Sequence, residues 1–127
     1  MHTTLNYNGE LTGQKGIHFR HESDLVNSYL EEIERKISVS NPVHVSDLTG
    51  FIFDYIEESN YNVDLILIAD KHSFQRSGNE YNDEYYRLLW QRTKYVTIDS
   101  IERSARNLAS LIYSAWLAAG SPNLENL

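Results

Sequence analysis

Residues 98–119 read IDSIERSARNLASLIYSAWLAA, and their apolar residues recur in alternating steps of three and four. Positions spaced in this way share one face of an α-helix. The pattern therefore predicts a helix whose apolar stripe packs along neighbouring helices. The members of the stripe are Ile98, Ile101, Ala105, Leu108, Ile112, Ala115 and Ala119.

Helical spacing extends toward the N-terminus as far as Tyr81. Whether residues 81–119 form one helix or two is open, because Thr97 could cap a second one. Gly120 and Pro122 end the region, glycine just past the last turn and proline beyond it.

Earlier segments predict further helices. Spacings of three and four predict a helix over residues 17–37, and Ser46 is a candidate N-cap for another over about 47–59. The apolar run 63–69 fits a buried strand or a buried helix, and its helical surroundings favour a helix. Residues 73–79 are predicted to be a loop.

These patterns predict an all-α helical bundle. A chain of 127 residues is in the size range of one domain. We expect a single domain over residues 1–127, with a loop over 1–17, helices over 18–120 and a tail over 121–127.

Composition narrows the function classes. Eighteen acidic and eleven basic residues give a net charge of -7, which disfavours a purely electrostatic grip on a nucleic-acid backbone. The absence of cysteine excludes disulfides and thiolate metal sites. The longest apolar run is far too short to span a membrane, so no transmembrane segment is expected. No signal-peptide pattern opens the chain, and the compartment is left open.

The stretch from His2 to Glu22 has the spacing of a metal site. His18 and Glu22 are four residues apart at a predicted helix start, so that their side chains share a face. His2, across a loop rich in glycine and asparagine, is a candidate third ligand. Two imidazoles and one carboxylate suit zinc and leave a coordination position for water, as catalytic zinc requires.

Other interpretations of these residues remain. A histidine and a glutamate four residues apart also form surface ion pairs or helix caps. His21 could be a substitute ligand, a partner of a ligand or an exposed histidine, and we expect it to be exposed. No glycine-rich phosphate loop and no nucleophile elbow is present.

Two blocks of sequence resemble a known family. The run HTTLNYNGELTGQKGIH from His2 to His18, and YSAWLAAGSPNL from Tyr113 to Leu124, are similar to the C-terminal portion of bacterial zinc-dependent phospholipase C proteins. Those proteins resemble in turn the fungal and plant single-strand-specific nucleases. The resemblance implies the C-terminal portion of that mostly helical fold.

In that superfamily, three zinc ions hydrolyse phosphate esters. Carried over by position, His2, His18 and Glu22 resemble three ligands of one zinc. The H-x-x-x-D motif that serves the other zincs would fall before Met1, so the resemblance implies one complete zinc site in this chain and not three. The position of His21 is usually aromatic in the family.

The resemblance implies a truncated zinc-dependent phosphodiester hydrolase, weak or inactive alone, with a phospholipid or nucleic acid as substrate. Relatives are usually exported. The rival interpretation is a non-catalytic helical module that binds zinc or another protein. Helices missing from a bundle leave apolar faces uncovered, which favours self-association or a partner.

Overall fold

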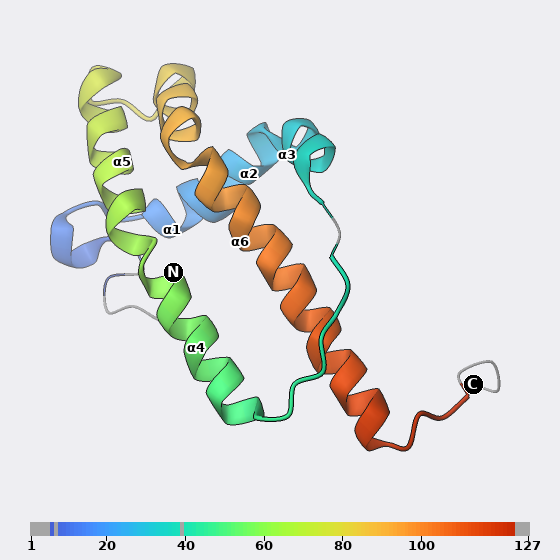
Figure 1. The fold of residues 1–127 in the computed structure, drawn as a ribbon. Helices are drawn as coiled ribbons and strands as arrows, with labels where there is room; N and C mark the ends of the chain where they lie inside the picture. Colours follow the sequence, from blue (N-terminus) through green and yellow to red (C-terminus); the bar gives the residue numbers. More distant parts are fainter. Residues whose placement is uncertain (1–5, 7, 39, 124–127) are drawn as a thin grey trace.

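The computed structural model describes residues 6, 8–38 and 40–123, and within these ranges every regular element is a helix (Figure 1). This confirms the all-α prediction. The elements, in chain order, are η1 (Glu10–Thr12), α1 (Ile17–Phe19), η2 (Arg20–Asp24), α2 (Leu25–Ser28), α3 (Leu30–Lys36), α4 (Leu48–Asn60), α5 (Val63–Arg76) and α6 (Asp83–Ala118).

Helix α6 is one uninterrupted helix of 36 residues, about 54 Å long at the usual rise. Its N-cap is Asn82, whose Oδ1 accepts a hydrogen bond from the backbone N–H of Tyr85 at 3.1 Å. Thr97 does not start a second helix, because its hydroxyl donates to the Thr93 carbonyl at 3.0 Å, inside the helical turn. This answers the question that the sequence left open.

Two boundaries differ from the predictions. The apolar run 63–69 is helical, as favoured, but α5 continues to Arg76, so residues 73–76 are not the predicted loop. The N-cap of α4 is Asp47, not Ser46. The Asp47 Oδ1 accepts from the backbone N–H of Gly50 at 2.9 Å, which satisfies one of the unpaired donors at the helix start.

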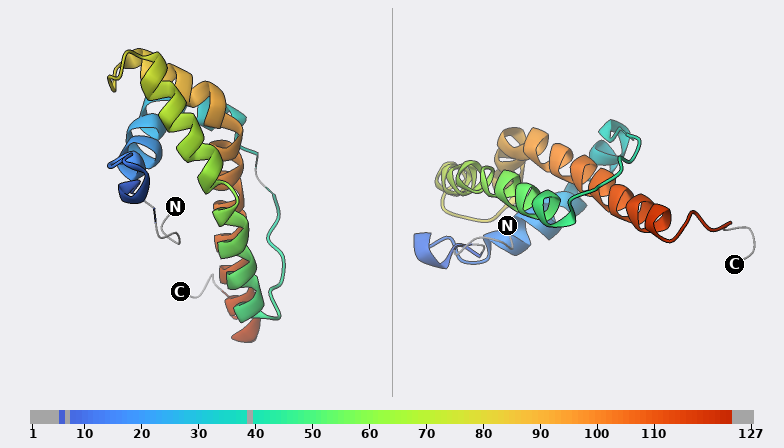
Figure 2. Two further views of the ribbon diagram at one scale, coloured as in Figure 1. Left: turned by 90° about the vertical axis from the view of Figure 1, so that its left-hand side faces the viewer. Right: turned by 60° about the horizontal axis from the view of Figure 1, so that its bottom comes forward.

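The predicted helix over residues 17–37 is present in pieces. Residues of η2 form a π-helical turn between α1 and α2. Tyr29, with φ −119 and ψ 19, then separates α2 from α3. The segment thereby changes direction and crosses the N-terminal half of α6 (Figures 1 and 2).

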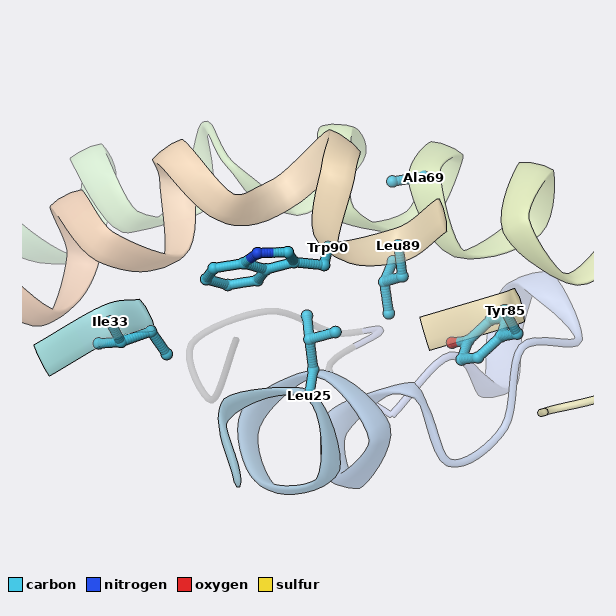
Figure 3. Packing of buried hydrophobic residues seen from close by; sticks show 6 residues of the cluster. All are labelled: Leu25, Ile33, Ala69, Tyr85, Leu89 and Trp90. Carbon is cyan, nitrogen blue, oxygen red and sulfur yellow. The ribbon is translucent and has the colours of Figure 1, made fainter. Parts of the chain in front are cut away.

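The hydrophobic core lies where α5 and the α2–α3 segments meet the N-terminal half of α6 (Figure 3). Trp90 is its largest side chain. It stacks on Tyr29 with ring centroids 4.5 Å apart and donates from Nε1 to Glu32 Oε2 at 2.8 Å. The buried cluster consists of Leu25, Ile33, Ala69, Tyr85, Leu89 and Trp90.

Residues 40–45 form an extended segment that runs along the C-terminal half of α6 (Figure 1); we call it the strap. The backbone N–H of Val43 donates to Ser110 Oγ at 3.0 Å, and that of Val45 donates to Ser114 Oγ at 2.8 Å. Two extended residues advance about as far as four helical ones, so the two hydrogen bonds stay in register.

The opposite side of this half-helix is uncovered. Leu108 and Ile112 are 60% and 62% exposed, so the prediction that the whole stripe packs against helices is wrong over this half. We call the exposed members, Ala105, Leu108, Ile112, Ala115 and Ala119, the α6 stripe. No helix in the described ranges combines the length and apolar composition of a membrane span.

Candidate metal centre

His18 and Glu22 lie together at the start of the helical segment. His18 belongs to α1 and Glu22 to η2. The His18 Nδ1 is 3.5 Å from Glu22 Oε1, and the two side chains are about one-third exposed (27% and 31%). The predicted pairing of an imidazole and a carboxylate on one helical face is therefore present.

The turn that carries Glu22 is π-helical. The backbone N–H of Leu25 donates to the Arg20 carbonyl five residues earlier. A π-turn inserts an extra residue into the helix and shifts the side chains that follow, and such turns are frequent at functional sites. Here it lies between His18 and the buried face of α2.

A buried ion pair fixes this turn to the rest of the protein. Arg20 Nη2 lies 3.1 Å from Asp70 Oδ1 on α5, and Arg20 Nε donates to the Tyr85 hydroxyl on α6 at 3.1 Å. The Tyr85 hydroxyl in turn donates to Asp70 Oδ1 at 2.5 Å. Three elements thus meet in one hydrogen-bonded network, and its member Arg20 is two residues from both His18 and Glu22.

The pKa shifts of Tyr85 and Arg20 keep both groups protonated in this network. Burial, and then the hydrogen bond to Asp70, raise the pKa of Tyr85 far above its ordinary value, so its proton stays in place to donate. Burial opposes the charge on Arg20, but the hydrogen bond with Tyr85 and the nearby Asp70 carboxylate raise the Arg20 pKa overall. The sequence patterns did not reveal this network, because its members are 15 to 65 residues apart.

The glycine-rich loop is anchored to the same carboxylate. Gln14 Nε2 donates to Asp70 Oδ2 and to the Leu67 carbonyl, each at 2.7 Å. Within the loop, the Gln14 N–H donates to the Gly9 carbonyl at 2.8 Å. Gly9 has φ +78, and a Cβ there would overlap the Gln14 carbonyl. The loop therefore needs glycine at this position for both reasons.

His21 is buried, with 6% of its surface exposed, so the prediction of an exposed histidine is wrong. The segment crosses α6 on this face, and His21 Nε2 lies 3.4 Å from the Thr97 hydroxyl. Burial lowers the His21 pKa to about 4, against the opposing effect of Glu22. His21 is therefore a neutral imidazole at physiological pH. Its Nδ1 has no hydrogen-bond partner among the described residues.

A pocket of about 400 Å³ opens beside Glu22 and His21. Its lining is more apolar than polar, and five of the lining residues carry hydroxyl groups: Thr97, Ser100 and Ser104 on α6, and Tyr55 and Ser59 on α4. The residues that line it in the described ranges include neither Lys nor Arg. Negative charge on a bound molecule would therefore have to be met by something other than a basic side chain of this wall.

The spacing of the His18–Glu22 pair fits zinc. Zinc–nitrogen and zinc–oxygen bonds of about 2.0–2.2 Å at a tetrahedral angle place two donor atoms about 3.4 Å apart; the observed separation is 3.5 Å. Within the described ranges, no group of three His, Cys, Asp or Glu side chains is close enough to hold a metal ion. The predicted third ligand, His2, lies outside the described residues.

No protein-family model, no curated protein and no solved structure matches this chain.

Proposed function

We propose that this chain is the C-terminal, zinc-binding portion of a zinc-dependent phosphodiester hydrolase of the phospholipase C and nuclease type. His2, His18 and Glu22 are the ligands, and turnover by the chain alone is weak or absent. The observation that carries the proposal is the 3.5 Å separation of His18 Nδ1 and Glu22 Oε1. The family assignment rests on the two sequence blocks that resemble it.

Zinc bound by two imidazoles and a carboxylate supplies an activated water and polarises a phosphoryl oxygen. The protein's own groups have separate roles. Arg20, through Asp70 and Tyr85, holds the ligand-bearing turn in position. Glu22 belongs to the pair of candidate zinc ligands and also lines the pocket. The pocket would accept the organic part of a phosphate ester, either a phospholipid or a nucleic acid.

The pocket wall supports a metal-dependent reaction. A phosphodiester is an anion, and the described wall offers hydroxyls, an amide, the neutral imidazole of His21 and the carboxylate of Glu22, but neither Lys nor Arg. One metal ion stabilises such a transition state less than a multi-metal clamp, which can hold both the attacking and the leaving oxygen. This is why we expect little turnover from a single site.

Zinc binding is the first test. Zinc titration by isothermal calorimetry should give one site per chain in the wild type. Affinity should fall by about tenfold or more, equivalent to at least 1.4 kcal/mol, in His2→Ala, His18→Ala and Glu22→Gln. His44→Ala, at an exposed histidine of the strap, is the matched control and should bind zinc as the wild type does. Equal affinity in all variants would reject the site.

Turnover is the second test. Hydrolysis of an activated phosphodiester by the zinc-loaded chain should be slow and should disappear in His18→Ala. Zinc binding with no turnover that depends on His18 would favour the alternative, a non-catalytic zinc-binding or protein-interaction module. That alternative is motivated by the apolar surface that the helices leave exposed, which suits self-association or a partner.

A further inference from the structure

The α6 stripe lies on the side of the helix that the rest of the protein does not cover. Leu108 and Ile112 are each two residues from Ser110, which places them about 200° around the helix from it. Ser110 is buried beneath the strap, and Ser104, nearer the middle of the helix, contacts Tyr55 of α4. The stripe therefore faces away from the strap. Leu108 lies one turn from Ser104 on the same face of the helix, toward α4, but at 60% exposure it is not covered by that helix.

This face lacks charge on a protein that is otherwise acidic. Residues 107–119 contain no Asp, Glu, Lys or Arg, whereas the whole chain carries a net charge of -7. Two copies of the chain repel each other over most approaches. The repulsion is weakest where this uncharged half-helix meets its own copy, so the surface is suited to a second copy of the same chain.

The spacing of the stripe is symmetric about Ser110. Ala105 and Ala115 are five residues from it on either side, and Leu108 and Ile112 are two residues from it. We propose that two copies pair through the α6 stripe with their helices antiparallel and a two-fold axis on the stripe side of the helix, at the level of residue 110. Leu108 then packs on Ile112 of the second copy, and Ala105 lies opposite Ala115, where small side chains allow close approach of the helices.

Charge selects the antiparallel arrangement. The charged residues of α6 nearest the stripe are Glu102, Arg103 and Arg106. In the antiparallel register they lie level with residues 118, 117 and 114 of the second copy, which are Ala, Leu and Ser. In a parallel register, Glu102, which flanks Ala105 one turn earlier on the helix, would lie level with Glu102 of the second copy and meet a like charge.

The interface is small. The residues from Ala105 to Ala119 extend about 21 Å along α6, and a single helix pair of this length buries less than the roughly 1,200–2,000 Å² of a standard interface. The dimer is therefore concentration-dependent, with dissociation in the micromolar range or weaker. Zinc has no part in the argument, so the pairing stands apart from the proposed hydrolase site.

Light scattering on a dilution series from millimolar to low micromolar protein, with a chelator present, tests the stripe. The wild type should pass from dimer to monomer, and Leu108→Glu should stay monomeric with an unchanged circular dichroism spectrum. Phe53→Glu on α4 is the control, because Phe53 is also exposed, at 66%, but lies outside the stripe; it should dimerise as the wild type does. A wild type that is monomeric throughout overturns the proposal.

Cysteine cross-linking tests the register, since the chain has no cysteine of its own. A mixture of Ala105→Cys and Ala115→Cys proteins should form a disulfide-linked dimer on oxidation. Ala105→Cys alone should form none, because the two copies of residue 105 are about 15 Å apart along the axis, beyond disulfide reach. Cross-linking of Ala105→Cys with itself, and not with Ala115→Cys, would show a parallel pair and overturn the antiparallel proposal.

Discussion

Arg20 and Asp70 form a buried ion pair, 3.1 Å between Nη2 and Oδ1, that connects the ligand-bearing turn to α5. Asp70 is 1% exposed and accepts hydrogen bonds from Gln14, Arg20 and Tyr85. One carboxylate thus organises the loop, the π-helical turn and α6. The position of His18 and Glu22 depends on a residue about 50 positions away.

Replacing Asp70 by Ala should destabilise the protein strongly. Arg20 would be left as a buried charge without its carboxylate, which typically costs about 3–5 kcal/mol. The free energy of unfolding in urea measures the effect. Asp54→Ala, at an exposed aspartate within α4, is the control and should change that free energy by less than about 0.5 kcal/mol. A similar small loss in both variants would contradict the role given to the ion pair.

Alanine at Gly9 should be more destabilising than alanine at Gly13. Both glycines have positive φ, +78 and +74, and a left-handed conformation costs an L-residue roughly 1–2 kcal/mol. Only at Gly9 would the new Cβ also overlap backbone, the Gln14 carbonyl; nothing lies within 4 Å of a Cβ at Gly13. The difference between the two unfolding free energies isolates the overlap, and equal losses would show that the loop relaxes around it.

His21 should make the metal-free protein lose stability in acid. Its pKa is about 4 in the folded protein and about 6.5, the ordinary value of histidine, in the unfolded chain, so between these pH values the unfolded chain binds a proton that the folded one does not. Stability is therefore full above about pH 6.5 and falls as the pH decreases to about 4, by on the order of 3 kcal/mol.

Urea denaturation across this pH range, with a chelator present, gives the measurement for His21. His21→Gln removes the titrating group, so the fall in the wild type between pH 6.5 and 4 should exceed that in the variant. Parallel curves for the two proteins would show that His21 is accessible to protons in the folded state.

Ser110→Ala should release the strap locally. Ser110 Oγ accepts from the Val43 N–H and donates to the Arg106 carbonyl at 2.8 Å. Losing such an acceptor costs about 0.5–1.5 kcal/mol. Hydrogen exchange of the Val43 amide should accelerate, while exchange in α5 stays unchanged. Ser104→Ala is the matched control, because Ser104 also donates to a carbonyl four residues earlier but does not contact the strap. This variant should leave the exchange rate of the Val43 amide unaltered.

Apolar periodicity predicted the helices well, because it depends on local spacing that each helix shows by itself. It placed α6 and α5 correctly as elements and gave the His18–Glu22 pair its geometry. It missed the π-helical turn and the continuation of α5 through Arg76, which depend on hydrogen bonding and packing that spacing does not encode. Contacts between residues far apart in the sequence determine the features that periodicity did not predict. Helix α6 buries His21, and Asp70 meets Arg20 only in the folded chain.

The α6 stripe also shows that spacing along one helix does not predict long-range contacts. A repeat such as Leu108 and Ile112 predicts a helical face that can be buried, but not which element covers it. In the monomer described, the strap takes the opposite side and hydrogen-bonds through Ser110 and Ser114. The burial of these two side chains was wrongly predicted because burial depends on how several helices are arranged, and not on the spacing within one helix.

The length of α6 has a consequence for how the protein opens. Its large buried side chains, Tyr85, Leu89 and Trp90, lie in the first third of the helix, whereas the part beyond Ile101 is held by hydroxyl contacts and by an ion pair from Arg103 to Glu58. Resistance to opening follows buried apolar contact. Brief fraying should therefore start at the C-terminal end and stop near the core, so that a protease would shorten α6 before it attacked the rest of the fold.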